Sequence, residues 1–224
     1  MPTVLLVRHG QASFGSADYD VLSDLGRRQA EIAAASLAER GYRPARLLSG
    51  TLRRQRETAD AFATLGVELE VEPRWDEFEA DEVLRHHGDS TVHLEGDADG
   101  EALTTRAFQD ALDPALAEWI AHGERSPTAQ TWPQFSAAGV GALRDLAADL
   151  ASGETAVVVT SAGTIGIVVG TILGAPADLF PTLNRVLVNA SVTKLAIGST
   201  GTNLISFNDH SHLELVDRAL VTYR

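Results

Sequence analysis

An arginine and a histidine, Arg8 and His9, stand next to each other near the start of the chain and are followed by Gly10. A neutral imidazole is a good nucleophile near neutral pH. A guanidinium offers paired, permanently charged donors that suit phosphate oxygens. The preceding residues 4–7 are all apolar, which predicts a strand that is buried on both faces. Open α/β sheets bind ligands at the carboxyl ends of their strands, so we expect Arg8 and His9 to lie in a ligand site.

Taken alone, this tripeptide is also typical of a surface charge beside a structural histidine, but a second, compatible segment follows at residues 49–59. A short predicted strand, residues 45–49, leads there into a helix whose first turn contains Arg53, Arg54 and Arg56. Backbone N–H groups and the positive end of the helix dipole attract anions at such a position. Cations are unfavourable in a first helical turn, a cost that a bound anion would offset. An exposed, charged helix face is the alternative interpretation.

The Arg-His-Gly tripeptide after an apolar first strand resembles the histidine phosphatase superfamily, the phosphoglycerate-mutase-like proteins. Residues 49–59 resemble the second phosphate-binding segment of that family, in which the arginine falls on Arg54. The resemblance implies that His9 is a nucleophile that becomes transiently phosphorylated, with Arg8 and Arg54 as catalytic and phosphate-binding cations. The other ring nitrogen of His9 would then need an acceptor, such as a backbone carbonyl.

The same resemblance also predicts which residue acts as the general acid. The alternation of apolar and acidic residues over 67–71 predicts an edge strand. The family places its acid in an Arg-Leu-x-Glu-like stretch after this strand, and the match falls on Glu77, with Trp75 in the leucine position. A protonated carboxyl there would donate to the leaving alcohol and later accept a proton from water. Asp76 and Glu79 are competing assignments.

One family residue is missing at the end of a further buried-type strand, predicted over residues 154–161. The family pattern there is Ser-His-Gly, and this chain reads Ser-Ala-Gly, so Ala162 stands where the second family histidine is expected. Loss of one preorganised donor typically costs about 10²–10³ in rate, which predicts weakened activity. Neutral phosphate donors are expected from Gln11, from Ser13 and from the amides of Ala162 and Gly163.

Three explanations for Ala162 stay open. The start of the following helix, with the Thr164 hydroxyl, would partly replace the histidine. A histidine from elsewhere in the chain would reach the site instead; the candidates are His86, His87, His93, His210 and His212. The chain would otherwise be non-catalytic, or altered by engineering at this position.

The first hypothesis for function is therefore a phosphatase that hydrolyses a small phosphomonoester through phospho-His9. The alternative is a catalytically impaired, phosphate-binding pseudoenzyme. A phosphoglycerate mutase is a weaker alternative, because the family's mutases carry Glu-Ser and then Trp-Asn shortly after Arg-His-Gly. Residues 11–15 read Gln-Ala-Ser-Phe-Gly and do not match that pattern.

The order of strands and helices predicts an α/β fold, a three-layer α/β/α sandwich with a mostly parallel central sheet. Strand, helix and strand over the first 49 residues predict a parallel pair, with Ser23 as the helix N-cap. Residues 79–133 break this rhythm and resemble the family's helical insertion, which covers the active site. Two further strands are predicted at 186–197 and 203–207. The whole chain, 1–224, is predicted to be a single domain with that cap.

Composition limits the partners. The 224-residue chain has a formal net charge of −13, which disfavours nucleic acid and anionic membranes. It has no cysteine, which excludes disulfides and thiolate chemistry. The sequence contains no stretch of about eighteen or more apolar residues, and no signal pattern precedes the first strand, so a cytoplasmic protein is expected. No motif with metal-ligand spacing occurs, so no metal or other cofactor is expected, and a homodimer is compatible with the sequence.

Overall fold

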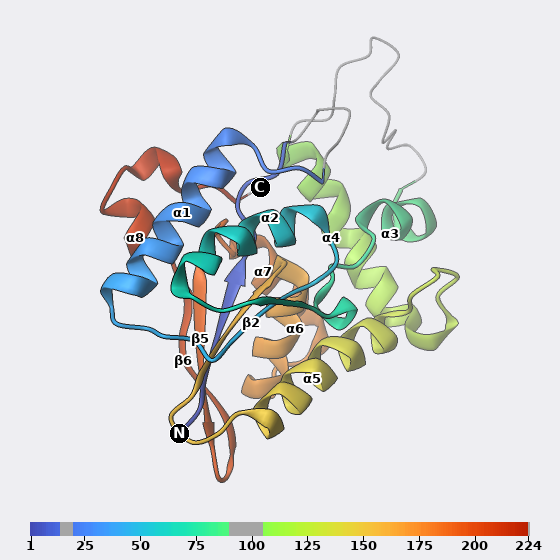
Figure 1. The fold of residues 1–224 in the computed structure, drawn as a ribbon. Coiled ribbons are helices and arrows are strands. Elements are labelled where there is room, and N and C mark those ends of the chain that lie inside the picture. Colours follow the sequence, from blue (N-terminus) through green and yellow to red (C-terminus); the bar gives the residue numbers. More distant parts are fainter. Residues whose placement is uncertain (14–19, 90–104, 224) are drawn as a thin grey trace.

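The computed structural model describes residues 1–13, 20–89 and 105–223. Helices and strands alternate along most of the described chain (Figure 1). The strands are β1 (Thr3–Arg8), β2 (Arg46–Ser49), β3 (Leu69–Val71), β4 (Thr155–Thr160), β5 (Val192–Gly198) and β6 (Gly201–Asp209). The α-helices are α1 (Asp24–Glu39), α2 (Arg53–Phe62), α3 (Ala80–His87), α4 (Thr105–His122), α5 (Trp132–Asp149), α6 (Ala162–Leu173), α7 (Phe180–Val186) and α8 (Ser211–Glu214). No helix among these residues is both long enough and apolar enough to cross a membrane.

The two most apolar strands, β1 and β4, form the centre of a six-stranded sheet with the order β3-β2-β4-β1-β5-β6. β4 pairs in parallel with β1 and with β2, β3 extends the parallel part, and β5 and β6 add antiparallel strands. The predicted α/β class, the mostly parallel sheet and the edge position of β3 are confirmed. The predicted pairing of the first two strands is wrong, because β4, which is buried on both faces, lies between them.

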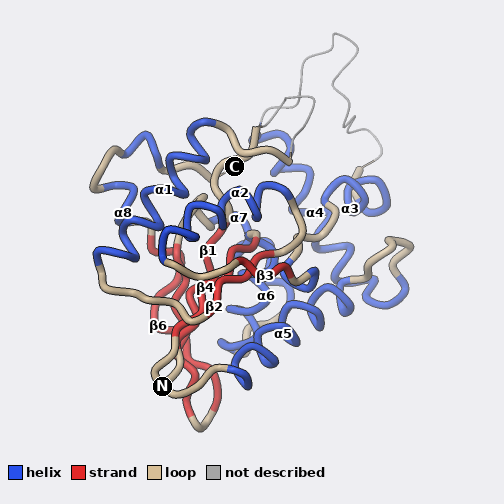
Figure 2. The backbone as a smooth tube through the Cα atoms, in the orientation of Figure 1, coloured by secondary structure: helices blue, strands red, loops and turns tan. Residues whose placement is uncertain are grey.

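Alternate residues of the central strands face different helix layers. Leu5 and Val7 pack in a buried cluster with residues of α1 and α2. Val4 and Leu6 belong to a second cluster that includes residues of α5 and α6. Figures 1 and 2 show the same arrangement, with α1 and α2 on one side of the sheet and α5 and α6 on the other. The predicted three-layer sandwich is therefore the observed architecture.

The loop after β1 passes so close to α1 that glycine is required on both sides. A Cβ at Gly10 would lie 2.3 Å from the carbonyl oxygen of Gly26. A Cβ at Gly26 would lie 2.1 Å from the carbonyl oxygen of Gln11. The predicted cap of α1 is confirmed, because the Ser23 hydroxyl accepts a hydrogen bond from the Gly26 amide. This packing fixes the main chain directly after His9.

Between β3 and β4 the described chain forms helices and no strand, so the rhythm stops where the sequence predicts. α3 and α4 pack together, and an aromatic cluster under them includes Phe78, Trp119 and Trp132. The Trp119 ring lies 5.5 Å from each of the other two rings, which assigns both tryptophans to helix packing. The cap over the active site stays a prediction.

The predicted strand over 186–197 is wrong in its first half. Val186 ends α7, and β5 begins only at Val192. The residues between them are buried and look like a strand in sequence, but they turn beneath the end of β1. Ala190 takes a φ of +56°, which alanine rarely adopts, and its amide donates to the Arg8 carbonyl at 3.0 Å.

Candidate active site

His9 lies at the carboxyl end of β1, is 6% exposed and has a partner at each ring nitrogen. Nδ1 is 2.7 Å from the Gly10 carbonyl oxygen, and Nε2 is 3.2 Å from Nε of Arg54. A carbonyl oxygen can only accept and a guanidinium can only donate, so the proton is on Nδ1 and the lone pair is on Nε2. The structure therefore holds the neutral tautomer whose Nε2 can act as a nucleophile, and Gly10 supplies the carbonyl acceptor that such a role requires.

The main chain around His9 is held by three elements. The His9 amide donates to the Thr160 carbonyl at 2.9 Å, and the His9 carbonyl accepts from the side chain of Asn189 at 3.2 Å. The Gly10 amide donates to the Thr58 hydroxyl at 3.0 Å, and this hydroxyl donates to the Arg54 carbonyl at 2.7 Å. The main chain after His9 is thus tied through Thr58 to the same helix that carries Arg54.

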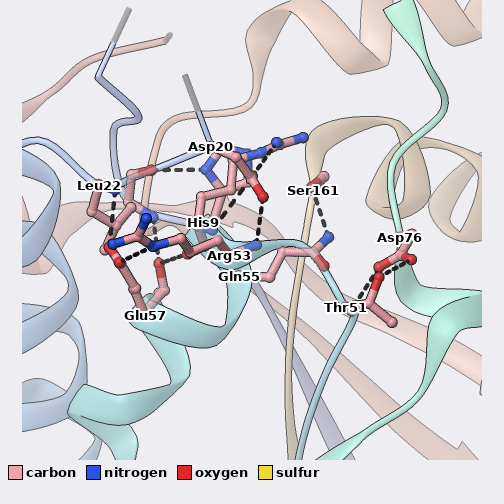
Figure 3. A network of polar contacts seen from close by, with 12 residues as sticks. His9, Asp20, Leu22, Thr51, Arg53, Gln55, Glu57, Asp76 and Ser161 are labelled. Atoms are coloured by element: carbon pink, nitrogen blue, oxygen red, sulfur yellow. Dashed lines mark hydrogen bonds and ion pairs between the residues drawn. The ribbon is translucent and has the colours of Figure 1, made fainter. Parts of the chain in front are cut away.

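Arg54 lies in the first turn of α2, and its guanidinium connects His9 with a carboxylate. Nε donates to His9, and Nη1 donates to Oδ1 of Asp20 at 2.6 Å. The other oxygen of Asp20 accepts from the Arg53 amide at 2.6 Å (Figure 3). The carboxylate at the start of α2 in this structure is the chain's own Asp20, and phosphate binding there stays a prediction.

Arg8 is the last residue of β1 and is 7% exposed. Because side chains alternate along a strand, it lies on the same face of the sheet as Val4 and Leu6. Its Nη1 donates to the carbonyls of Leu187 and Tyr223, the latter at 2.7 Å. Two main-chain acceptors therefore orient this guanidinium, one of them from the segment that ends the described chain.

Glu77 follows a short 3₁₀ turn, Pro73–Trp75, and its carboxylate meets the start of α6. Oε2 accepts from the Gly163 amide at 3.0 Å, and Oε1 accepts from the Phe78 amide at 3.2 Å. Loss of water around the carboxyl group raises the pKa of Glu77 above its ordinary value. The two amides and the nearby Arg54 and Arg8 charges act in the opposite direction without cancelling the effect of burial. A carboxyl group in this environment keeps its proton to a higher pH than an exposed glutamate.

The two competing acids have other positions. Asp76 accepts from the Thr51 amide at 2.5 Å and from the Thr51 hydroxyl at 2.6 Å, which ties the segments that follow β2 and β3 to each other (Figure 3). Glu79 is exposed at the start of α3. The Glu77 carboxyl group has a pKa raised by burial, and it interacts with the charges of both candidate phosphate-binding arginines. This favours Glu77 as the proton donor.

A sequence model of the histidine phosphatase superfamily (branch 1) matches residues 4–210. The chain belongs to this superfamily. A glucosyl-3-phosphoglycerate phosphatase from Mycolicibacterium vanbaalenii is 32% identical over 218 residues, which cover 86% of this chain and 83% of that protein. The family resemblance of the sequence is therefore confirmed, and with it the assignment to a superfamily of phosphoric monoester hydrolases.

Two solved structures of phosphatases share the fold. The native structure of a mycobacterial glucosyl-3-phosphoglycerate phosphatase has a TM-score of 0.64 at 24% identity and covers 92% of this chain and 98% of its own. A phosphoserine phosphatase mutant from Entamoeba histolytica, in complex with phosphoserine, has a TM-score of 0.68 at 19% identity. It covers 95% of this chain and 100% of its own.

In this histidine phosphatase superfamily member, Ala162 is 5% exposed and begins α6 next to the Gly163 amide that binds Glu77. The Thr164 hydroxyl donates to the Asp76 carbonyl at 2.7 Å, so its hydrogen is not directed at a phosphate. Two of the candidate histidines in the described chain have partners of their own: Nε2 of His87 lies 2.8 Å from the Ser126 hydroxyl, and Nε2 of His212 lies 3.1 Å from the Ala190 carbonyl oxygen. His93 lies outside the described residues.

Gln11 and Ser13, two of the residues predicted to donate neutral hydrogen bonds to a phosphate, make hydrogen bonds within the protein. The Gln11 side-chain oxygen accepts from the Ser23 hydroxyl at 2.9 Å. The Gln11 backbone N–H donates to the side-chain oxygen of Gln29 at 2.8 Å. The Ser13 amide donates to the Val21 carbonyl at 2.8 Å. These contacts fix the loop after β1 on both sides of residues 14–19, which lie outside the described chain. Across the described ranges, no three His, Cys, Asp or Glu side chains are placed to hold a metal ion.

Three residues of the site were not predicted from the sequence. Asp20 lies in a polar loop and Asn189 in an apolar segment, and neither has a pattern that points to His9. Gln55 is wholly buried and donates to the Trp75 carbonyl at 3.0 Å and to the Ser161 hydroxyl at 2.9 Å (Figure 3). It joins the start of α2 to the start of α6, which is a tertiary contact that spacing along the chain cannot reveal.

Proposed function

We propose that this chain is a phosphatase that hydrolyses a small phosphomonoester through a phosphohistidine on Nε2 of His9. The observation that carries the proposal is the fixed tautomer of His9, whose lone pair faces the guanidinium of Arg54. Phosphoryl transfer requires an in-line nucleophile and cations around the phosphoryl oxygens, and the protein contributes mostly position and charge. Arg54 and Arg8 supply those charges beside the nucleophile.

In the first step the lone pair of Nε2 attacks phosphorus, and the bond from phosphorus to the alcohol oxygen breaks. The nitrogen–phosphorus bond forms as Glu77 donates its proton to the leaving alkoxide. The Gly10 carbonyl accepts the Nδ1–H of His9 and stabilises the ring as it gains positive charge. The Arg54 Nε–H, which donates to Nε2 in the resting site, is then available to a phosphoryl oxygen.

In the second step a water molecule attacks the phosphorus of phospho-His9. Glu77, now a carboxylate, takes a proton from that water, and the nitrogen–phosphorus bond breaks with its electron pair returning to Nε2. Inorganic phosphate leaves, and both His9 and Glu77 return to their starting protonation states. The amides of Gly163 and Phe78 hold the carboxylate between the two steps.

The substrate class follows from the family and from the charge of the chain. The relatives are named for small phosphorylated substrates, glucosyl-3-phosphoglycerate and phosphoserine. A chain with a net charge of −13 needs a local cluster of cations to attract a phosphate, and Arg54 and Arg8 provide one. We propose a small, soluble phosphomonoester, with helices α3 and α4 contributing to its selection.

A phosphate-binding pseudoenzyme is the second candidate, and Ala162 is the observation that favours it. The resemblance places a histidine there, and among the candidate replacements His87 binds Ser126 and His212 lies against the Ala190 carbonyl. We propose that catalysis is retained, because the nucleophile, two cations and the buried acid are present. The missing imidazole would lower the rate by about 10²–10³ without removing the route.

Isolation of the phosphoenzyme tests the proposal. The chain is mixed with an excess of ³²P-labelled aryl phosphate without added metal, quenched, and analysed for protein-bound label. We expect label that is stable in alkali and labile in acid, as a phosphohistidine is, together with steady release of phosphate. Binding of inorganic phosphate with neither turnover nor label, across pH 5 to 8, would establish the pseudoenzyme instead.

Gly163→Ala tests the position of the acid. An added Cβ would lie 2.1 Å from Oε1 of Glu77 and 2.8 Å from Cε1 of Phe78, so the carboxyl group must move. A displacement of about 1 Å of a catalytic group can cost roughly 10²-fold, and we expect a loss of that order in kcat for an alkyl phosphate. Steady-state kinetics with an alkyl phosphate measures it.

Gly170→Ala is the matched control on the same helix. A Cβ there would lie 3.6 Å from Cδ1 of Leu183, an ordinary contact, so we expect unchanged kcat and a stability equal to or above that of the parent chain. Equal losses of kcat in the two variants would show that α6 does not tolerate an added methyl group at either glycine. The loss in Gly163→Ala could then no longer be attributed to displacement of the Glu77 carboxyl group.

A further inference from the structure

Asp20 makes a contact that neither the phosphate chemistry nor the family resemblance explains. Its Oδ1 accepts from Nη1 of Arg54 at 2.6 Å, and the same guanidinium donates from Nε to the nucleophile His9 at 3.2 Å. A guanidinium is planar, so contacts at two of its nitrogens fix the plane and the direction of the group. Asp20 and His9 together therefore determine where Arg54 points.

The carboxylate of Asp20 is itself anchored to the helix that carries Arg54. Its Oδ2 accepts from the Arg53 amide at 2.6 Å, and Oδ1 lies 3.5 Å from the Arg54 amide. The residue before α2 is Leu52, which has no side-chain oxygen, so Asp20 acts as the helix cap from 33 positions upstream. The positive end of the helix favours a carboxylate at this place.

The chain beside Asp20 is fixed as well. The Leu22 amide donates to Oε2 of Glu57 at 3.0 Å, and Glu57 also pairs with Arg53 and Arg27 (Figure 3). Leu22 is 3% exposed. The position of Asp20 is thus set by helix amides and by a buried neighbour as well as by the Arg54 side chain.

We propose that Asp20 is a positioning residue, which holds the Arg54 guanidinium on His9 and so raises the affinity of the site for a phosphate group. The inference rests on the proposed function. A long arginine side chain loses rotamer freedom when it binds an anion, and Asp20 imposes that order before the phosphate arrives. The opposing effect is repulsion between the carboxylate and the phosphate. The sign of the change in phosphate affinity on removing the charge shows which effect is larger.

Asp20→Asn separates the charge from the cap. The amide oxygen of asparagine still accepts from the Arg53 amide, so the melting temperature is expected to stay close to that of the parent chain. The charged contact to Arg54 is lost, and we expect about tenfold weaker binding of inorganic phosphate and about tenfold lower kcat/KM for an aryl phosphate. Asp20→Ala loses the cap too and is expected to show the same kinetic loss with a lower melting temperature.

A double-mutant cycle shows whether Asp20 acts through Arg54. In an Arg54→Ala background, Asp20→Asn is expected to change kcat/KM by less than about twofold, because the partner is gone. Asp24→Asn is the control: it removes the same charge from an exposed position in the first turn of α1, and is expected to leave kinetics unchanged.

Two results would overturn the inference: tighter phosphate binding in Asp20→Asn, which makes Asp20 a competitor of phosphate, or an undiminished loss in the Arg54→Ala background. Failure of the proposed function looks different. The parent chain would then bind phosphate without turnover, while the cycle, measured on phosphate binding, still decides the role of Asp20.

Discussion

Replacement of His9 by alanine is expected to reduce phosphatase turnover by at least about 10³-fold, because no other described group presents a lone pair at this position. The imidazole contributes the bond-forming atom, and the Gly10 carbonyl and Arg54 both orient it. Hydrolysis of an aryl phosphate at fixed enzyme concentration measures the loss. The labelled phosphoenzyme should disappear with it.

The same variant is expected to keep its phosphate affinity within a few fold. Arg8 keeps its main-chain carbonyl partners in this variant, and Arg54 keeps its contact with Asp20 although it loses the one with His9. Calorimetric titration with inorganic phosphate tests this. His122→Ala, which removes an exposed imidazole near the end of α4, is the control and should retain full turnover. Turnover that survives in His9→Ala would place the nucleophile elsewhere and end the phosphohistidine proposal.

Much of this site could be predicted from sequence because its chemistry lies at the ends of strands. A short, wholly apolar run favours a strand that is buried on both faces, and polar residues directly after such a strand lie at the edge of the sheet. The observed His9 follows β1 directly, and its ring contacts Arg54 in the first turn of α2. The same logic found β4, whose end carries Ala162 and Gly163.

The missed features depend on contacts between distant segments. The order of β1, β4 and β2 depends on which strand is most fully buried, which local pattern does not reveal. Asp20 caps a helix that begins 33 residues later, and Asn189 reaches His9 from the far end of the chain. Residues 187–191 are buried and apolar enough to resemble a strand, yet they turn in order to supply amides to the nucleophile segment. In each case the constraint is tertiary.

The second large prediction concerns Glu77 and depends on the leaving group of the substrate. Glu77→Gln removes the proton donor and is expected to lower kcat for an alkyl phosphate by about 10²–10⁴-fold. A nitrophenolate leaves without a proton, so the loss with a nitrophenyl phosphate should be far smaller. Steady-state kinetics on the two substrates measures the difference. Glu79→Gln, in the exposed position two residues on, is the control for the change of charge and should match the parent chain on both substrates.

The pH dependence of the same reaction has a defined sign. The acid must be protonated in the first step, and burial raises the pKa of Glu77, so the protonated form persists above the range of an ordinary glutamate. Activity on the alkyl phosphate should therefore fall as the pH rises through that raised pKa. In Glu77→Gln this alkaline limb should be absent. Equal losses on both substrates, with the limb retained, would assign the proton transfer to another group.

The pH dependence of thermal stability provides an independent test of the raised pKa of Glu77. A carboxyl group whose pKa is raised by folding binds more protons in the folded state than in the unfolded state, so it lowers stability as the pH rises above the ordinary glutamate range. Glu77→Gln removes this cost, and its melting temperature should exceed that of the parent chain at pH 8 and approach it at pH 4. A glutamate at this position lowers the stability of the folded chain at neutral pH relative to a neutral glutamine. Its presence despite that cost fits an acid that must gain and lose a proton in each turnover.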